Sequence, residues 1–400
     1  MNVSIPLNLY SFNSLILICF LFLLSSCNPS EKTGIVPVQG KLDNLKKEYV
    51  PDRRVQIFDF EISKDGTRVI GSTSNEEAYQ QVIELKTFYP NINLDSFFLS
   101  TPLGQALVNV SVCNLRSLPK HSAELVTQAL LGQPMTIWKK EGSWLYVQTV
   151  EKYLGWVDAG AITELSKKDM ATYGTKNKVM FTDDFGICIE KPENSSGVVS
   201  DIVAGNILVQ SGLQSGFYKV VFPDGRQGYI PSHSANPVRE ILNNPVPDWA
   251  KIEKTARRFM GRPYLWGGTS GKGVDCSGFT KMVYYLHGLL LPRDASQQVH
   301  SGKEVAIDHL ENLQPGDFLF FGEKGKNGKN DRVTHVAIHL GDGKIIHSSE
   351  KVRIESINPG DEDYNPYRKK TLLSAKRMIS NGIINNGVLK LDENEMYDVF

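Results

Sequence analysis

An ungapped internal repeat constrains the fold of this chain more than any other feature of the sequence. A shift of 73 residues aligns similar positions: Gly132 with Gly205, Trp144 with Phe217, Val147 with Val220, and Gly155-Trp156-Val157 with Gly228-Tyr229-Ile230. Both copies consist of short alternating segments separated by Gly, Pro and Asp turns, as in antiparallel strands. The repeat predicts two small all-β barrels, at residues 103–165 and 166–240, whose aromatic residues serve core and rim packing.

The N-terminus contains an apolar run, SLILICFLFLL, at residues 14–24. The run is too short to span a bilayer as a helix, which needs about 20 residues, but it suits a signal-peptide core. It ends in Leu24-Ser25-Ser26-Cys27, which resembles a bacterial lipobox. The resemblance implies a lipoprotein signal peptide at residues 1–26 and a lipid on Cys27, although no Lys or Arg precedes the run. An uncleaved membrane anchor is the alternative.

The anchor predicts an exported protein, lipid-anchored to a bacterial cell membrane and facing the periplasm or the cell exterior. Lys and Arg number 44, as do Asp and Glu, so overall charge indicates no nucleic-acid partner. Once the signal peptide is removed and Cys27 is lipidated, three thiols remain, and three thiols do not make a disulfide framework. Cys113 and Cys188 lie in apolar stretches and are expected to be buried free thiols, whereas the surroundings of Cys276 differ.

Composition and turn signals assign the other segments. An alternating segment and a helical stretch at residues 75–88 indicate a small α/β unit before the barrels. Asp248 is a good N-cap for a helix that opens the last domain. The resulting segments are a linker at 27–50, a small N-terminal α/β segment at 51–102, a last domain at 245–380 and a C-terminal extension at 381–400.

The segment RPYLWGGTSGKGVDCSGFTKMVYYLHG contains the strongest chemical signal in the chain. Glycines precede Cys276, and Phe279, Met282 and Val283 follow it at helical spacing, so Cys276 is expected at a helix N-terminus. Such a position stabilises negative charge, which lowers a thiol pKa, and its backbone amides can hold an oxyanion. The segment therefore predicts a thiol nucleophile. A Cys in a structural turn is the alternative.

A base for the thiol is expected in THVAIHLGDGKIIHSS, which has the pattern of a β-hairpin around Gly341-Asp342-Gly343. If all three residues form the loop, Leu340 pairs with Lys344, and His347 lies diagonal to His335 on one face, about 7 to 8 Å away. A two-residue loop would turn the two rings to opposite faces. We predict the three-residue loop, with Gly343 in the left-handed conformation.

A zinc site is the competing interpretation, because one Cys and three His form a zinc-compatible set. His335 and His339 lie four residues apart on one strand, however, which separates them by about 13 Å and prevents them from sharing an ion. No metal or other cofactor is expected. His339 is expected to be a packed strand residue.

Six phrases, YLWGG, DCSGF, LPRDASQQ, LQPGDFLFF, THVAIHLGDG and IIHSS, resemble in this order the NlpC family of cell-wall cysteine peptidases over residues 248–378. The resemblance implies an α+β chain with a papain-like domain, in which Cys276 is the nucleophile, His335 the base and His347 the residue that orients it. The GSWLYVQT and YLGWV phrases resemble bacterial SH3-like domains. This combination is similar to the branch that cleaves after γ-D-Glu in L-Ala-γ-D-Glu-diamino-acid peptides.

The same branch implies residues that surround the substrate. They are Tyr264 and Asp275 flanking the site, Ser277 as a substrate contact, Asp294 facing the substrate amine, and Glu124 and Tyr153 reaching the cleft from the first barrel. Ala295 stands where many relatives have Ser, so one hydroxyl is missing. The alternative roles are a helix N-cap for Asp294, core packing for Tyr264, a surface charge for Glu124 and a rim aromatic for Tyr153.

These features predict a cysteine endopeptidase that hydrolyses the bond between γ-D-Glu and a diamino acid in murein stem peptides with a free N-terminal L-Ala, in peptidoglycan turnover or recycling. Its expected partners are these peptides and, through the lipid, a membrane. The alternatives are an N-acetylmuramoyl-L-alanine amidase, an acyltransferase on the same core, and a murein-binding protein with an inactive peptidase domain.

Overall fold

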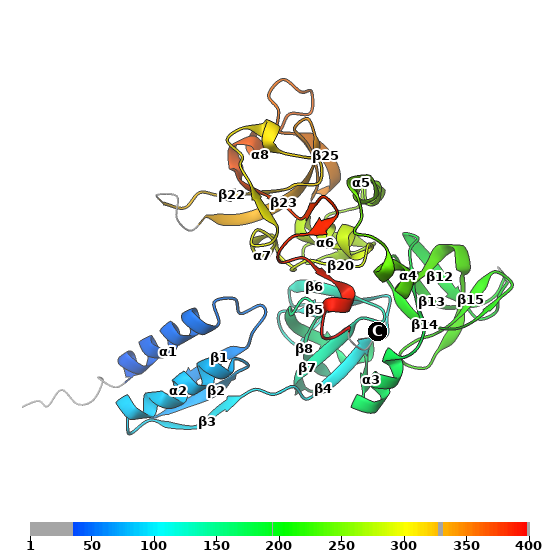
Figure 1. The fold of residues 1–400 in the computed structure, drawn as a ribbon. Coiled ribbons are helices and arrows are strands. Elements are labelled where there is room, and N and C mark those ends of the chain that lie inside the picture. Colours follow the sequence, from blue (N-terminus) through cyan, green and yellow to red (C-terminus); the bar gives the residue numbers. More distant parts are fainter. Residues whose placement is uncertain (1–34, 194, 327–330, 398–400) are drawn as a thin grey trace, which may run out of the picture.

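The computed structural model describes residues 35–193, 195–326 and 331–397, arranged as an N-terminal module, two barrels and a C-terminal domain (Figure 1). The predicted signal peptide and Cys27 lie outside these residues. None of the helices in the described ranges is long and apolar enough to cross a membrane.

The N-terminal module is a three-stranded sheet packed against two helices. Its elements are α1 (Ile35–Tyr49), β1 (Phe58–Ile62), β2 (Arg68–Thr73), α2 (Glu76–Phe88) and β3 (Asn93–Leu99). The strands lie in the order β1-β2-β3, with β2 and β3 parallel. Asn75 caps α2, since its side chain accepts a hydrogen bond of 2.8 Å from the Ala78 backbone N–H.

The prediction of a linker at residues 27–50 is wrong for α1. Val38 and Leu42 are buried in the core of the module, and Leu45 packs against the same core. These three residues recur at helical spacing, which places them on one face. Lys and Glu residues give the segment a polar composition, and that composition concealed the apolar face of a helix.

Two seven-stranded barrels follow, and the 73-residue shift relates them strand by strand. The first contains β4 (Gly104–Val108), β5 (Val112–Arg116), β6 (Leu125–Leu130), β7 (Pro134–Glu141), β8 (Trp144–Gln148), β9 (Leu154–Asp158) and β10 (Ile162–Leu165). The second contains β11 (Lys178–Phe181), β12 (Phe185–Ile189), β13 (Val198–Val203), β14 (Ile207–Gln214), β15 (Phe217–Val221), β16 (Gln227–Pro231) and β17 (Ala235–Pro237). The bounds of β7, β8 and β9 coincide after the shift with those of β14, β15 and β16, which confirms the repeat.

The repeated glycines make the joint between the barrels. Gly132 and Gly205 both adopt a positive φ, 81° and 90°, which favours glycine. A Cβ on Gly132 would lie 2.0 Å from the carbonyl oxygen of Ile207, at the start of the second barrel. The helix α3 (Lys167–Gly174) connects the barrels, and α4 (Val238–Asn243) leads out of the second one.

The C-terminal domain packs helices against a six-stranded sheet in the order β21-β26-β22-β23-β24-β25. The sheet strands are β21 (Lys303–Val305), β22 (Phe318–Glu323), β23 (Arg332–Gly341), β24 (Lys344–Ser349), β25 (Lys351–Ser356) and β26 (Leu372–Arg377). The helices are α5 (Trp249–Arg258), α6 (Cys276–Tyr285), α7 (Ala295–Gln298) and α8 (Pro366–Thr371), and the short strands are β18 (Thr269–Ser270), β19 (Gly273–Val274) and β20 (Leu289–Leu290). Helix α6 lies against β23 and β24, and its residues Phe279 and Val283 are fully buried in the core.

The C-terminal extension is folded onto the rest of the protein. After β27 (Ile379–Ser380) and β28 (Ile383–Ile384), β29 (Leu389–Lys390) pairs with β20. The segment then reaches the first barrel, where the Asn394 side chain donates a 2.8 Å hydrogen bond to the Val150 carbonyl. Figure 1 shows this red segment between the first barrel and the C-terminal domain.

Buried polar contacts join the first barrel to the C-terminal domain. Arg293 Nε donates to Thr127 Oγ1 at 2.8 Å, and the Thr269 backbone N–H donates to Gln128 Oε1 at 3.0 Å. Lys281 and Glu151 form an ion pair of 2.5 Å, with side-chain exposures of only 4% and 2%. Buried charges of this kind need their partners, so the interface holds the barrel in one position.

Candidate active site

Cys276 is the first residue of α6, as the sequence predicts. Asp275 is the N-cap, and its Oδ1 accepts a 2.7 Å hydrogen bond from the Gly278 backbone N–H. Glycine is required at position 278, because a Cβ there would lie 2.0 Å from the Gly268 carbonyl oxygen. The glycine-rich approach thus packs directly against the first turn of the helix. Backbone N–H groups at the start of a helix, such as those of Cys276 and Ser277, can stabilise an oxyanion beside the thiol.

The thiol of Cys276 is buried, and this determines its charge. Burial, followed by the nearby Asp275 carboxylate, raises the pKa of Cys276 to about 12, although the backbone of Val336 and the Arg293 guanidinium oppose the shift. The expectation that the helix N-terminus lowers this pKa is wrong, because desolvation outweighs it. Burial therefore favours the neutral thiol, which needs a base in order to react.

The hairpin brings two histidines together, but by a different route from the one predicted. Asp342 and Gly343, with φ of 49° and 73°, form a two-residue loop, and Gly341 rather than Leu340 pairs with Lys344. The prediction of a three-residue loop is therefore wrong. A bulge between His339 and Gly341 adds the missing residue and restores the predicted register, in which Ile338 pairs with Ile346.

His335 and His347 consequently lie on one face, with His335 Nε2 2.8 Å from His347 Nδ1. A third residue extends this series of hydrogen bonds, since His347 Nε2 lies 3.0 Å from Glu355 Oε2. Because a carboxylate only accepts, His347 donates from Nε2 and accepts from His335 at Nδ1. His335 then donates from Nε2 and retains its lone pair on Nδ1, as a base requires.

Burial favours the neutral form of both rings. Burial lowers the pKa of His335 well below its usual value, and electrostatic interactions with His347, Arg368 and Arg353 add to this effect. Burial also lowers the pKa of His347, and the hydrogen bond that His347 donates to Glu355 opposes this shift. Partial burial opposes ionisation of Glu355, but His347 and its other partners lower the pKa of this carboxyl to about 2. The environment therefore favours a neutral His335 and His347 beside a charged Glu355 carboxylate.

One cavity of about 570 Å³ collects the predicted site residues of both domains. Its lining includes Cys276 and all of the predicted substrate residues: Tyr264, Asp275, Ser277, Asp294, Glu124 and Tyr153. His335 and His347 are buried, 8% and 0% exposed, and do not belong to the lining. Cys276 lines the cavity, and His335 follows directly after Val333 and Thr334, which line it as well.

Two of the lining residues, Asp275 and Ser277, form polar contacts with Arg293. Asp275 binds Arg293 through a 2.6 Å ion pair. The Ser277 hydroxyl lies 3.1 Å from Arg293 Nη1 and 3.3 Å from Asp275 Oδ1. Arg293 is 1% exposed, so this cluster fixes the loop that carries Cys276. The Ser277 hydroxyl is already hydrogen-bonded in the substrate-free protein.

The far end of the cavity is made by both domains. Tyr153 of the first barrel donates a 3.0 Å hydrogen bond to Asp294 Oδ2, and Arg54 donates a 2.6 Å bond to the same oxygen. Glu124 accepts a 2.7 Å bond from the Trp266 indole N–H. Asp294 is also the N-cap residue of α7, so the predicted alternative role and the cavity role coincide in one residue.

Comparison with known proteins agrees with this arrangement. The NlpC/P60 family matches residues 261–377, and the bacterial dipeptidyl-peptidase Sh3 domain matches residues 115–162. The chain is 34% identical to the γ-D-glutamyl-L-lysine dipeptidyl-peptidase of Bacillus cereus (strain ATCC 10987 / NRS 248), over 59% of this chain and 71% of that protein. The chain belongs to the NlpC/P60 family.

Two further comparisons extend the similarity beyond the peptidase domain. Dipeptidyl-peptidase 6 of Lysinibacillus sphaericus is 30% identical over 66% of this chain and 94% of its own length. The crystal structure of an NlpC/P60 family protein from Bacillus cereus ATCC 10987 matches with a TM-score of 0.59 and 27% identity, over 68% of this chain and 99% of that one. The predicted α+β fold, the SH3-like barrel before the peptidase domain and the cysteine peptidase class are confirmed.

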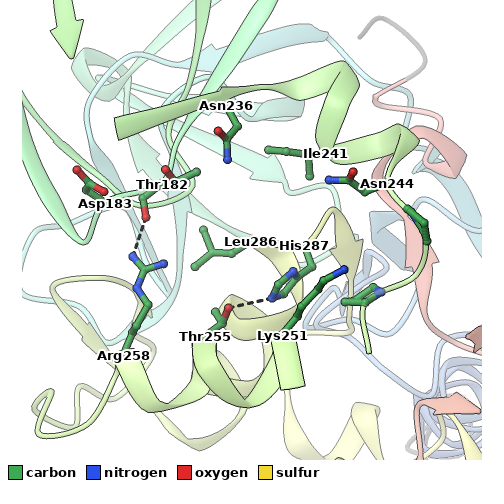
Figure 2. Close-up of a pocket in the computed structure, with 12 residues that line it drawn as sticks. Thr182, Asp183, Asn236, Ile241, Asn244, Lys251, Thr255, Arg258, Leu286 and His287 are labelled. Atoms are coloured by element: carbon green, nitrogen blue, oxygen red, sulfur yellow. Dashed lines mark hydrogen bonds between the residues drawn. The ribbon is translucent and has the colours of Figure 1, made fainter. Parts of the chain in front are cut away.

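A second cavity of about 400 Å³ in this NlpC/P60 peptidase lies between the second barrel and α5 (Figure 2). His287 Nε2 lies 2.9 Å from Thr255 Oγ1 there, and Arg258 donates a 2.7 Å bond to the Thr182 carbonyl. No Cys lines this cavity. The predicted substrate residues line the cavity that contains Cys276, and none of them lines this one.

The remaining Cys residues and His339 have the structural roles that the sequence predicts. Cys113 and Cys188 are free thiols, 1% and 0% exposed, inside the two barrels. His339 is 2% exposed, and its Nδ1 lies 3.1 Å from the Gln314 carbonyl oxygen. None of the three lines the cavity with Cys276.

Three polar residues of the NlpC/P60 site were not predicted from the sequence. Arg293 lies in the LPRDASQQ phrase, where an Arg next to Asp294 could have been recognised as a partner for a carboxylate. Arg353 of β25 pairs with His347 of β24, and Glu355 lies two residues further along β25. Residues two apart on a strand share a face, so the sequence could have indicated that Glu355 lies on the same face as His347. Arg54 lies far away in the sequence and had no such signal.

Proposed function

We propose that this NlpC/P60 peptidase hydrolyses the bond between γ-D-Glu and a diamino acid in cell-wall stem peptides with a free N-terminal L-Ala. The observation that carries the proposal is that Cys276 and the Asp294–Tyr153 pair line one cavity from two domains. The names of the Bacillus cereus and Lysinibacillus sphaericus relatives, both dipeptidyl-peptidases, support release of a dipeptide from a free N-terminus.

The reaction begins with the thiol of Cys276. Its Sγ attacks the side-chain carbonyl carbon of D-Glu while its proton passes to His335 Nδ1. The carbonyl oxygen becomes an oxyanion, which the backbone N–H groups at the start of α6 stabilise. The C–N bond then breaks, His335 returns the proton to the departing diamino-acid amine, and an acyl thioester remains on Cys276.

Water completes the cycle. His335 removes a proton from water as the oxygen attacks the thioester carbonyl, and the C–S bond breaks. The dipeptide leaves as a free acid, and Cys276 recovers its proton. Throughout, His347 keeps the His335 ring in one orientation, and the Glu355 carboxylate stabilises the imidazolium that forms in each transition state.

The free N-terminal amine of the substrate accounts for the proposed specificity of the enzyme. A desolvated ammonium needs compensating acceptors. Asp294 and Glu124 line the cavity with two carboxylates, and the Tyr153 hydroxyl binds Asp294. A stem peptide still joined to muramic acid has an amide in place of the ammonium and lacks this charge interaction. This favours peptidase action on released peptides over the amidase reaction.

We also propose roles for the other predicted residues. Asp275, held by Arg293, positions the loop of the nucleophile, and Ser277 and Tyr264 form the wall of the cavity beside the D-Glu residue. For location, the Leu24-Ser25-Ser26-Cys27 sequence after the apolar run supports export with a lipid on Cys27. A lipid-anchored enzyme would meet wall peptides outside the cytoplasm.

Mass analysis of digests tests the reaction. The chain from residue 28 onward is incubated with L-Ala-γ-D-Glu-L-Lys and with muramoyl-linked stem peptide. We expect free L-Ala-γ-D-Glu from the first substrate and little product from the second. Cys276→Ala should abolish the product without unfolding the protein, and a chelator should leave the rate unchanged. Release of an intact stem peptide from muramic acid would identify an amidase and contradict the proposal.

A further inference from the structure

The connector at residues 50–57 brings one side chain of the N-terminal module into the peptidase cavity. This side chain is Arg54, which belongs to the lining of the cavity that contains Cys276. Arg54 Nη1 donates to Asp294 Oδ2 at 2.6 Å and to Ser296 Oγ at 3.0 Å. The carboxylate assigned to the substrate amine is therefore in direct contact with a residue about 240 positions earlier in the chain.

Arg54 is held firmly in this position. Both oxygens of Asp52 accept from its guanidinium, at 2.7 Å from Nε and 2.8 Å from Nη2. Asp52 is itself fixed by the Gln297 side chain of α7, which donates a 2.7 Å bond. The backbone is anchored as well, because the Leu154 N–H donates a 2.7 Å bond to the Arg54 carbonyl. The guanidinium is thus preorganised by both the barrel and the peptidase domain.

We propose that Arg54 is a specificity-determining residue, which fixes Asp294 as the receptor for the substrate's N-terminal ammonium. The inference rests on the proposed function and adds the N-terminal module to the active site. Tyr153 and Arg54 both donate to Oδ2, while Oδ1 lies 3.7 Å from Arg293 Nη1. With one oxygen doubly held, the carboxylate plane is fixed and cannot rotate away from an incoming amine.

The charges around Asp294, here called the Asp294 corner, still favour binding of an ammonium although the Arg54 guanidinium is present. Glu124 and Asp294 line the cavity with two carboxylates. The Arg54 guanidinium is bound by Asp52, and Arg332 is the other cation of the lining. The nearby Arg293 is balanced by its own ion pair with Asp275. The Asp294 corner therefore remains net negative. About a quarter of the Asp294 side chain stays exposed, so the carboxylate remains accessible from the cavity.

The experiment compares two substrates on the full chain in detergent. The substrates are L-Ala-γ-D-Glu-L-Lys and the same peptide acetylated at its N-terminus. The variants are Arg54→Met, which removes the charge but keeps the apolar stem, and Arg54→Lys, which restores a cation. The matched control is Arg53→Met, because Arg53 is the exposed neighbour and does not line the cavity. Thermal unfolding of each variant checks the fold.

We expect Arg54→Met to lower kcat/KM for the free peptide about tenfold, mainly through KM, because loss of one charged hydrogen bond is worth about that much. The rate on the acetylated peptide should not change, so selectivity for the free amine falls about tenfold as well. Arg54→Lys should recover part of this selectivity. Arg53→Met should match the wild type on both substrates.

Two results would overturn the inference. If a folded Arg54→Met protein kept the wild-type selectivity for the free amine, Arg54 would only connect the N-terminal module to the peptidase domain. A faster reaction on the free peptide would mean that Arg54 competes with the amine. The proposed function fails separately, if the wild type itself cleaves neither peptide or shows no preference for the free amine.

Discussion

Glu355 is the residue whose replacement tests the proton relay most directly. Glu355→Gln keeps the size of the side chain, and the amide oxygen can still accept from His347 Nε2. The tautomers of His347 and His335 are therefore preserved, while the negative charge is lost. We expect kcat to fall with little change in KM, because the charge acts on an imidazolium that exists only while the proton is on His335.

The structure gives the size of this effect. Adding the hydrogen bonds of 3.0 and 2.8 Å to the width of the His347 ring places the carboxylate roughly 8 Å from His335. Two unit charges at that distance interact by about 2 kcal/mol at an effective dielectric constant of about 20. Arg353, 2.6 Å from the other Glu355 oxygen, offsets part of this. The remaining 1 to 2 kcal/mol corresponds to a loss of roughly five- to thirtyfold in kcat.

The assay is steady-state cleavage of L-Ala-γ-D-Glu-L-Lys, with kcat and KM determined separately. Glu350→Gln is the matched control, because Glu350 also pairs with Arg353, at 3.0 Å, but its side chain is 80% exposed and has no contact with His347. The control should keep full activity. A Glu355→Gln enzyme within twofold of the wild type would refute the relay, as would a loss confined to KM.

Three further predictions follow from the same geometry and from the N-terminal sequence. His335→Ala should cost about 100- to 10,000-fold in kcat and His347→Gln far less, since an amide can orient a ring but cannot replace the base; equal, near-total losses would reverse the assignment. The free energy of unfolding should decrease as pH falls below about 6.5, because His335 and His347 bind protons in the unfolded chain but not when they are buried. Chemical denaturation between pH 8 and 5 measures this, and the free energy of unfolding should decrease less steeply in His335→Gln than in the wild type. Cys27→Ser should release the protein from membranes or leave an uncleaved precursor; a mature-length chain that still fractionates with membranes would exclude the lipid anchor.

The sequence predicted the chemistry of the site better than the local geometry behind it. The position of Cys276 at a helix start followed from glycines and apolar spacing, and the partnership of His335 with His347 followed from strand alternation. The predicted type of the loop between β23 and β24 was wrong. A two-residue loop with a bulge produces the same strand register as a three-residue loop without a bulge. Pairing patterns alone do not distinguish these two solutions.

Other features depended on burial and on contacts between distant segments. The pKa of Cys276 follows from desolvation, which the helix pattern does not report. Helix α1 was missed because its polar face dominates its composition, and its packing partner lies in α2. Arg54 could not have been assigned to the site, since its role arises only when the connector docks beside Tyr153 and Asp294.

The docked C-terminal segment has a consequence for the order in which the enzyme matures. Strand β29 pairs with β20, and Asn394 binds the loop that carries Val150 in the first barrel, so residues 389–397 fasten the barrel to the peptidase domain. During synthesis these residues emerge after every part of the cavity has been made. The barrels and the catalytic sheet can fold as separate units beforehand. The joint that aligns Tyr153 and Glu124 with Cys276 can therefore gain these contacts only after residues 389–397 have been made, in addition to the buried contacts that Arg293 and Lys281 form with the first barrel.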